Sequence, residues 1–208
     1  LEVVDFVVKK VNKKVPVLAQ TGLNDTSRSV ILSIRAKALG LDGLILSAPY
    51  YSQGNELGLI NHFKSIAIAG GLPAYIDNDP ARTGLNLSPG LIAKLVEIPN
   101  IVGIIESSSD LNHLADLSPL INDDFVLISG NDKTVLASLA MGASAHVSVL
   151  ANICPRLIFN IYDKFIEGDL AGARQVFNDS LKAIDLMNLD VNPIPVKTAM
   201  NMLGYEVG

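Results

Sequence analysis

Several residues with reactive or ion-binding side chains stand at the ends of short apolar runs in this sequence. Asp77 and Arg82 follow one run, Glu106 follows another, and Lys133 lies just beyond a third. A guanidinium fork suits a carboxylate ligand, a carboxyl group can move a proton, and a lysine amine can form a Schiff base with a ketone. These residue types indicate a site for small molecules if the fold brings them together.

Each of these residues also has a purely structural interpretation. Arg82 could form a surface ion pair, and Asp77 and Asp79 could cap a turn beside Pro80. A buried Glu106 would need a hydrogen-bond partner. Lys133 is the only lysine just past an apolar run, and we expect it to point to solvent from the helix that follows Asp132.

The histidines and the cysteine do not indicate a metal site or a bound cofactor. His62 and His113 fall on predicted helices and His146 on a predicted strand start, and no two histidines have metal-ligand spacing. Cys154 has no cysteine partner, so we expect it to be a small buried hydrophobe. We therefore expect no metal and no cofactor.

The elements that would position these residues repeat along the chain. Six apolar runs start 28, 29, 29, 24 and 20 residues apart, which is about the length of a strand-plus-helix unit. Runs that are apolar throughout are typical of parallel strands covered on both faces. The predicted strands are Val15–Ala19, Gly43–Ala48, Leu72–Ile76, Ile101–Ile105, Phe125–Ser129 and Ala145–Leu150.

Helical patterns fill the intervals between these runs. Valines at helical spacing predict that the chain begins on a helix. Helix caps are predicted at Ser27, Asn55, Ser88, Asp110 and Asp132. Three further helices are predicted over 155–168, 169–189 and 195–203, the last two with no strand between them.

Repeated strand–helix units give either an open doubly wound sheet or a (β/α) barrel. No Gly-x-Gly-x-x-Gly or Walker-type motif occurs, which lowers the case for a nucleotide-binding open sheet. Since a barrel has eight strands, we expect an α/β fold, a (β/α)8 TIM barrel whose first two strands precede Leu1. The barrel portion would span residues 1–168, and a C-terminal helical extension would span 169–208.

Composition excludes several classes of protein. The chain is 49% hydrophobic and 18% charged, which argues against disorder, and its net charge of −5 argues against a nucleic-acid partner. No apolar run reaches the roughly 18 residues that a membrane span needs. A single cysteine fits a reducing compartment. The start has no initiator Met and no basic signal-peptide region, so we expect a cytoplasmic location.

Six phrases at the predicted strand ends resemble the dihydrodipicolinate synthase / N-acetylneuraminate lyase family, in family order. They are Pro16–Gly22, Pro49-Tyr50-Tyr51, Pro80–Gly84, Ile101–Ile104, Ser129–Asp132 and Asn192–Lys197. The last phrase is most similar to the synthase branch, which makes a lysine precursor. The resemblance implies a (β/α)8 barrel with a C-terminal helical extension, and usually a homotetramer.

The resemblance also implies pyruvate chemistry through a Schiff-base lysine, from which this chain departs. The lysine position, after a Gly-Ile pair, is Ile105, which has no nucleophile. The position of the proton-shuttling tyrosine is Asp77, and an ordinary carboxylate is ionised near neutral pH and cannot donate a proton. Of the relay only Tyr51 survives, and the family's threonine partner would precede residue 1.

Some binding positions of the family remain. Arg82 matches the arginine that takes the second substrate's carboxylate, and Gly130 and Val147 match residues lining the pyruvate site. Asn24 and Tyr50 match two positions of a lysine-feedback site. The glutamate expected there is Arg28, which would repel a lysine ammonium, so we expect no lysine control.

Three functions stay open at this point. The first is a lyase relative without Schiff-base activity, which binds a 2-keto acid or other carboxylate or acts as the partner of an active paralogue. The second is an active pyruvate-dependent lyase that uses another lysine, such as Lys133, and the third is a non-enzymatic scaffold. Tyr50 and Tyr51 could be contacts of a homo-oligomer, a dimer or tetramer, because tyrosine is favoured at interfaces.

Overall fold

A computed structural model describes all 208 residues, which form two compact units, Leu1–Leu127 and Ile128–Gly208. The strands are β1 (Leu18–Gln20), β2 (Gly43–Ser47), β3 (Ala74–Asn78), β4 (Ile101–Glu106), β5 (Val126–Ser129) and β6 (Ala143–His146). The helices up to residue 120 are α1 (Glu2–Val11), α2 (Thr26–Ala38), α3 (Glu56–Gly70), α4 (Pro80–Thr83), α5 (Pro89–Val96), α6 (Leu111–Leu117) and η1 (Ser118–Leu120). Those that follow β5 are η2 (Asp132–Thr134), α7 (Val135–Ala140), η3 (Leu150–Asn152), α8 (Pro155–Ile166), α9 (Leu170–Met187) and α10 (Ile194–Met202).

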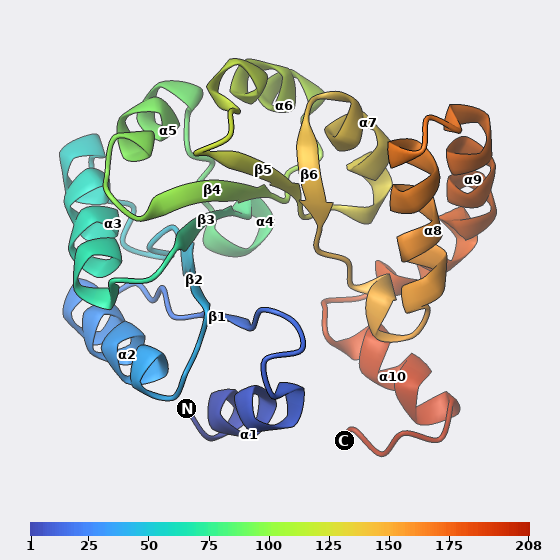
Figure 1. The fold of residues 1–208 in the computed structure, drawn as a ribbon, viewed down its shortest axis with the longest axis horizontal. Coiled ribbons are helices and arrows are strands. Elements are labelled where there is room, and N and C mark those ends of the chain that lie inside the picture. The colour runs from blue at the N-terminus through green and yellow to red at the C-terminus, as the bar shows by residue number, and fades with distance from the viewer. The chain divides into compact units, whose positions relative to one another are not determined.

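In the first unit, β1, β2, β3 and β4 pair in parallel in the order of the chain. The register sets Ser47 beside Asp77, and Asp77 beside Ile105. Helices α2, α3 and α5 lie along one face of these strands (Figure 1). Because parallel strands end at the same edge, this register fixes which side chains meet at their carboxyl ends.

The two faces of these four strands differ in burial. Leu44, Leu46, Ile76 and Ile104 alternate along their strands and are fully buried. The residues between them face the other way, and Ile45, Tyr75 and Asp77 among them are only half-buried. The prediction that the strands are covered on both faces therefore holds fully on the helix side and in part on the other, where Ser47 and Ile105 are buried.

The second unit is mainly helical. Helices α8 and α9 pack together along the apolar stripe that includes Ile158 and Ile161 of α8 and Ala173 and Ile184 of α9. The helices predicted over 155–168, 169–189 and 195–203 are confirmed as α8, α9 and α10. The boundary between the two units, after Leu127, does not bear on the boundary predicted after residue 168 between the barrel and the C-terminal helices, which stays a prediction.

Six strands form, as predicted, but the bounds of three of them differ from the prediction by more than one residue. The strand predicted from Val15 begins only at Leu18, because Pro16 has no amide proton and the Val17 amide donates to the Asp42 carboxylate at 2.8 Å. The strand predicted over Leu72–Ile76 is shifted two residues, to Ala74–Asn78. Asp77 therefore lies within β3.

The sixth strand was predicted too late in the chain. It covers Ala143–His146, so His146 ends the strand instead of starting it, and Leu150 begins the short helix η3. The Asp132 carboxylate contacts the His146 ring and accepts a hydrogen bond from the Leu150 amide. These two interactions bend the apolar run out of the sheet.

Most predicted helix caps are confirmed. The side chains of Asn55, Ser88 and Asp110 accept hydrogen bonds from backbone amides of the first turn. Two predicted caps are wrong. Asp25 instead of Ser27 caps α2, and Asn131 instead of Asp132 caps the turn η2. Both true caps carry a short side-chain oxygen acceptor, so sequence alone did not separate them from their neighbours.

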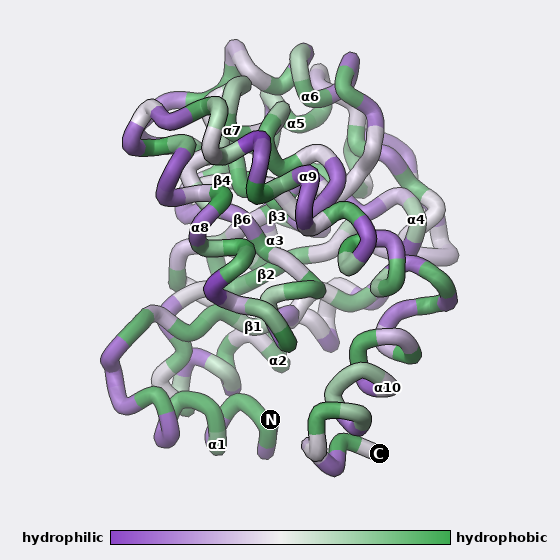
Figure 2. Tube along the Cα trace, turned by 90° about the vertical axis from the view of Figure 1, so that its right-hand side faces the viewer, coloured by the Kyte–Doolittle hydropathy of each residue, from purple (hydrophilic) through white to green (hydrophobic).

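Helix α1 forms as the valine spacing predicts, but none of its residues is buried. Its tube is coloured hydrophobic over much of its length in Figure 2. Val3 and Phe6 are among the most exposed apolar side chains of the protein. No helix combines the length and the apolar character that crossing a membrane requires.

Candidate functional site

A row of polar side chains crosses the half-buried face of β1, β2 and β3 at their carboxyl ends. The Gln20 amide nitrogen donates to the Ser47 hydroxyl. Ser47 Oγ in turn donates to Asp77 Oδ2 at 2.9 Å. The three residues, called here the polar row, thus form a directed hydrogen-bond chain that ends on a carboxylate.

Ile105 continues this row on β4. Its register partner is Asp77, and adjacent residues of parallel strands point to the same face. Only 5% of Ile105 is exposed. The position next to the carboxylate is therefore occupied by a branched apolar side chain without a nucleophile.

The Asp77 carboxyl is not an ordinary one, which corrects the expectation from sequence. Burial raises its pKa, and the charges of Asp79 and Glu106 act in the same direction. The Ser47 hydrogen bond and the Arg82 charge oppose this increase without cancelling it. Asp77 thus holds a proton more readily than a free aspartate does.

Arg82 stands on α4, the short helix directly after β3. Its Nε atom lies 3.6 Å from Asp79 Oδ2, and about half of its side chain is exposed. Neither Asp77 nor Asp79 caps the turn through its side chain, so that structural interpretation is wrong. The Asp77 carboxylate binds Ser47, and the Asp79 side chain makes no cap hydrogen bond.

On the opposite, helix-facing side of the same strand ends lies a buried polar network. Glu106 is buried and has partners, as predicted: its Oε2 accepts from Asn78 Nδ2 and its Oε1 from the Ser108 amide, both at 2.8 Å. His113 Nδ1 lies 3.2 Å from Glu106 Oε2, without hydrogen-bond geometry. Asn78 Oδ1 accepts a hydrogen bond from the Leu87 amide, which fixes the segment that follows α4, the helix of Arg82.

The two tyrosines after β2 are both exposed. Tyr51 is 93% exposed and has a left-handed backbone, with φ of 71°, a conformation that is uncommon for a residue with a large side chain. Tyr50 is less exposed, at 39%. The surrounding chain of this unit does not enclose either side chain.

In the second unit, Lys133 of η2 reaches across to α9. It is half exposed and forms an ion pair with Asp185 of α9 at 2.6 Å. Gly130 follows β5, and Val147 follows β6 with half of its side chain exposed and its amide bound to the Ser129 carbonyl. The nearby buried pair is formed by His146 and Asp132, 2.8 Å apart.

Other predicted residues take positions of less chemical interest. Asn24 and Arg28 are exposed at the start of α2. His62 and His113 lie on α3 and α6 as predicted. Cys154 is only partly buried, at the start of α8, so its prediction as a buried hydrophobe is wrong. No three His, Cys, Asp or Glu side chains gather as possible metal ligands.

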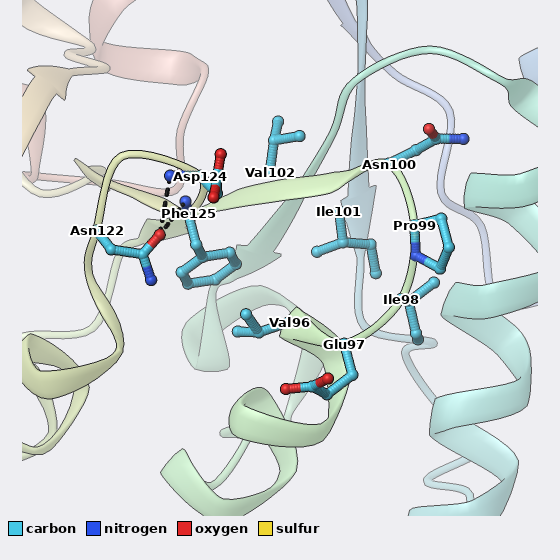
Figure 3. A pocket seen from close by; sticks show the side chains of 10 residues that line it. All are labelled: Val96, Glu97, Ile98, Pro99, Asn100, Ile101, Val102, Asn122, Asp124 and Phe125. Atoms are coloured by element: carbon cyan, nitrogen blue, oxygen red, sulfur yellow. Dashed lines mark hydrogen bonds between the residues drawn. The ribbon is translucent and has the colours of Figure 1, made fainter.

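A surface hollow lies at the other end of β4, between the segment Val96–Val102 and residues Asn122, Asp124 and Phe125 (Figure 3). Figure 3 shows Asn122 hydrogen-bonded to the backbone of its own turn. The residues that line the hollow lie at the amino-terminal end of β4. In (β/α) barrels that end serves stability, and active sites form at the carboxyl ends.

Two members of the polar row, Gln20 and Ser47, were not predicted from the sequence. Ser47 is a polar residue within the otherwise apolar run Gly43–Ala48, and Gln20 directly follows another such run. These interruptions were the available signal. Only the strand register joins them to Asp77.

Comparison with known proteins agrees with this fold. The model of the Dihydrodipicolinate synthetase family matches residues 1–208. The 4-hydroxy-tetrahydrodipicolinate synthase of Geobacter sulfurreducens is 40% identical over 204 residues, covering 98% of this chain and 70% of the relative.

Solved structures are similar as well. The 4-hydroxy-tetrahydrodipicolinate synthase of Methylacidiphilum fumariolicum SolV superposes with a TM-score of 0.95 at 33% identity, over 98% of this chain and 68% of that one. The chloride-inhibited dihydrodipicolinate synthase of Acinetobacter baumannii, solved with pyruvate, gives 0.93 at 35% identity, over 98% and 70%.

The fold and the site at its strand ends thus define a (β/α)-barrel protein of the lyase type, with six of the barrel's strands in this chain. Within that class, the chain belongs to the dihydrodipicolinate synthetase family.

Proposed function

We propose that this protein binds small carboxylic acids at the strand-end site of its family but forms no Schiff base with pyruvate. The observation that carries the proposal is Ile105, which stands on the site-facing side of β4 beside Asp77. Imine formation requires an amine, and isoleucine has none. Lyase chemistry through a covalent pyruvate intermediate would then be lost.

The proton relay of the family is altered in the same place. Asp77 stands where the resemblance puts the relay tyrosine, and Tyr51 alone matches a relay residue. A buried carboxyl can move a proton, but it is shorter than a phenol and bound to Ser47. Two changes on adjacent strands support a lost covalent step better than one would.

The ligand side of the proposal rests on Arg82, whose guanidinium suits a carboxylate. A relative of 35% identity was solved with pyruvate, which supports a small 2-keto acid or another carboxylate as the class of ligand. We further propose a cytoplasmic homo-oligomer, a dimer or tetramer, or a subunit that associates with an active paralogue.

A synthase that uses another lysine is the competing function, and relatives named as synthases at 40% identity favour it. Lys133 would be its nucleophile. Its side chain is half exposed and held in an ion pair with Asp185 of α9, so it does not stand in a desolvated site. This observation counts against Lys133.

Borohydride trapping tests the proposal. We expect wild-type protein incubated with pyruvate and borohydride to keep its intact mass. Ile105→Lys should gain one reduced pyruvate adduct, mapped to position 105, because it returns an amine to the site. Intact-mass spectrometry and peptide mapping measure both results.

Ile105→Met is the matched control, since it changes the same side chain without adding an amine, and it should gain no adduct. Thermal unfolding by circular dichroism verifies that each variant is folded. An adduct on the wild-type protein would overturn the proposal, and its loss in Lys133→Ala would identify the alternative nucleophile. A folded Ile105→Lys variant without adduct would show that position 105 does not face the ligand.

A further inference from the structure

We propose that the polar row selects a small carboxylic acid with a hydrogen-bond donor on carbon 2, a hydroxyl or an ammonium group, over a 2-keto acid. The inference deepens the proposed function and rests on it, because it takes position 105 to be free of an amine. The ligand class is that of 2-hydroxy and 2-amino acids.

The hydrogen bonds of the polar row all run in one direction, toward Asp77. Gln20 donates to Ser47, and Ser47 has a single hydroxyl proton, which it donates to Asp77 Oδ2. The row therefore ends in an acceptor at Asp77. What this end of the row offers a ligand is the second carboxylate oxygen, Oδ1, which calls for a ligand N–H or O–H.

The chemistry of the ligand gives the second step. The oxygen of a 2-keto group can only accept a hydrogen bond, so it would face the Asp77 carboxylate as a second acceptor. The neighbouring Ile105 has no donor to offer it. A hydroxyl or ammonium on carbon 2 donates to the carboxylate. Burial raises the pKa of Asp77, but a bound donor favours the charged form and lowers that pKa again.

The neighbours of Asp77 give the third step. Ile105 presents an apolar wall beside the carboxylate, which suits a methyl or short alkyl group on carbon 2. Arg82, on the helix that follows β3, is close enough for its charge to act on Asp77. A guanidinium there suits the ligand carboxylate. Asp77 and Ile105 on one face, together with Arg82 on the helix after β3, thus offer partners for all three substituents.

The test compares L-lactate, L-alanine and pyruvate as ligands of the full chain, by isothermal titration calorimetry with NMR line broadening as a second readout. We expect lactate or alanine to bind about tenfold or more tightly than pyruvate, as one hydrogen bond to a charged group implies. Asp77→Asn should abolish that preference, because its amide can donate to a keto oxygen. Arg82→Ala should weaken all three ligands.

Asp124→Asn is the matched control: it makes the same chemical change at an exposed position in the hollow at the other end of β4. Its preference should equal that of the wild type. Equal affinity for the three ligands, tighter binding of pyruvate, or no binding of any at tens of millimolar would overturn the inference. The wild-type comparison decides even if Asp77→Asn fails to fold. A borohydride adduct would instead refute the proposed function.

Discussion

At the scale of single residues, the proposed function depends on two neighbouring positions at the strand ends. Ile105 and Asp77 lie side by side on neighbouring strands. Replacing an amine by an alkyl group removes the electrophilic iminium, and a carboxylate beside it favours ligands that donate. The fold can persist because neither change affects the buried, helix-facing side of β3 and β4.

A second pair of residues makes the stability of the protein depend on pH. Burial acts to raise the pKa of Asp132, but hydrogen bonds from His146, Ser148 and the Leu150 amide act against burial, and the net effect lowers that pKa. A lowered folded-state pKa adds stability above the unfolded value of about 4 and loses it as the pH falls through the folded value.

We therefore expect Asp132→Asn to lower the free energy of unfolding at pH 7 by about 2 kcal/mol, since it removes a charged acceptor from buried hydrogen bonds. The difference from wild type should shrink at pH 3, where the wild-type carboxylate begins to take up its proton. Urea unfolding at both pH values measures this. Asp185→Asn, in the exposed pair with Lys133, should cost less than about 1 kcal/mol. A difference that is unchanged at pH 3 would contradict the assignment.

Among the elements, the close approach of the segment after β1 to β2 positions the polar row. A Cβ atom on Gly22 would lie 2.6 Å from the Ser47 nitrogen and 2.9 Å from the Leu46 Cα, both backbone atoms. The backbone of a central strand cannot move aside to make room for a Cβ atom, whereas the end of a flexible side chain can. A glycine here lets β1 and β2 bring Gln20 and Ser47 into contact.

We expect Gly22→Ala to destabilise the protein by about 1–3 kcal/mol, the cost of overpacking, and to weaken ligand binding by displacing Ser47. Gly90→Ala is the control, because nothing lies within 4 Å of its Cβ position in α5. That change should be neutral or stabilising by up to about 1 kcal/mol. Melting temperatures compare the two, and equal effects would argue against the close approach.

For the molecule as a whole, the exposed Tyr51 marks the surface where we expect a second copy of the chain. Its left-handed backbone holds an aromatic ring out in solvent, and aromatic residues are enriched in interfaces. A left-handed backbone is unfavourable for tyrosine, and contacts between the Tyr51 ring and a second copy of the chain would offset that cost.

Tyr51→Ala should therefore weaken self-association by about tenfold or more, as loss of an interface anchor does. Sedimentation velocity over a concentration series measures the change. Tyr205→Ala, an exposed tyrosine in the C-terminal tail, should leave the association constant unchanged. A wild-type protein that stays monomeric at all concentrations would refute this surface.

The sequence by itself determined the strand–helix repeat, most helix caps, the family and the positions of Ile105, Asp77 and Arg82. These follow from local patterns, because apolar periodicity and capping side chains act over a few residues. The predicted strand ends were wrong where a side chain distant in sequence accepts a hydrogen bond from the backbone. Asp42 does so from the Val17 amide, and Asp132 from the Leu150 amide.

Only the tertiary structure decided the chemistry of the polar row. Gln20, Ser47 and Asp77 are separated by 27 and 30 residues, and only the strand register joins them into one directed chain. The same packing buries Asp77 and raises its pKa. Register and burial depend on contacts between distant segments, so no local pattern in the sequence encodes which ligand group the site receives.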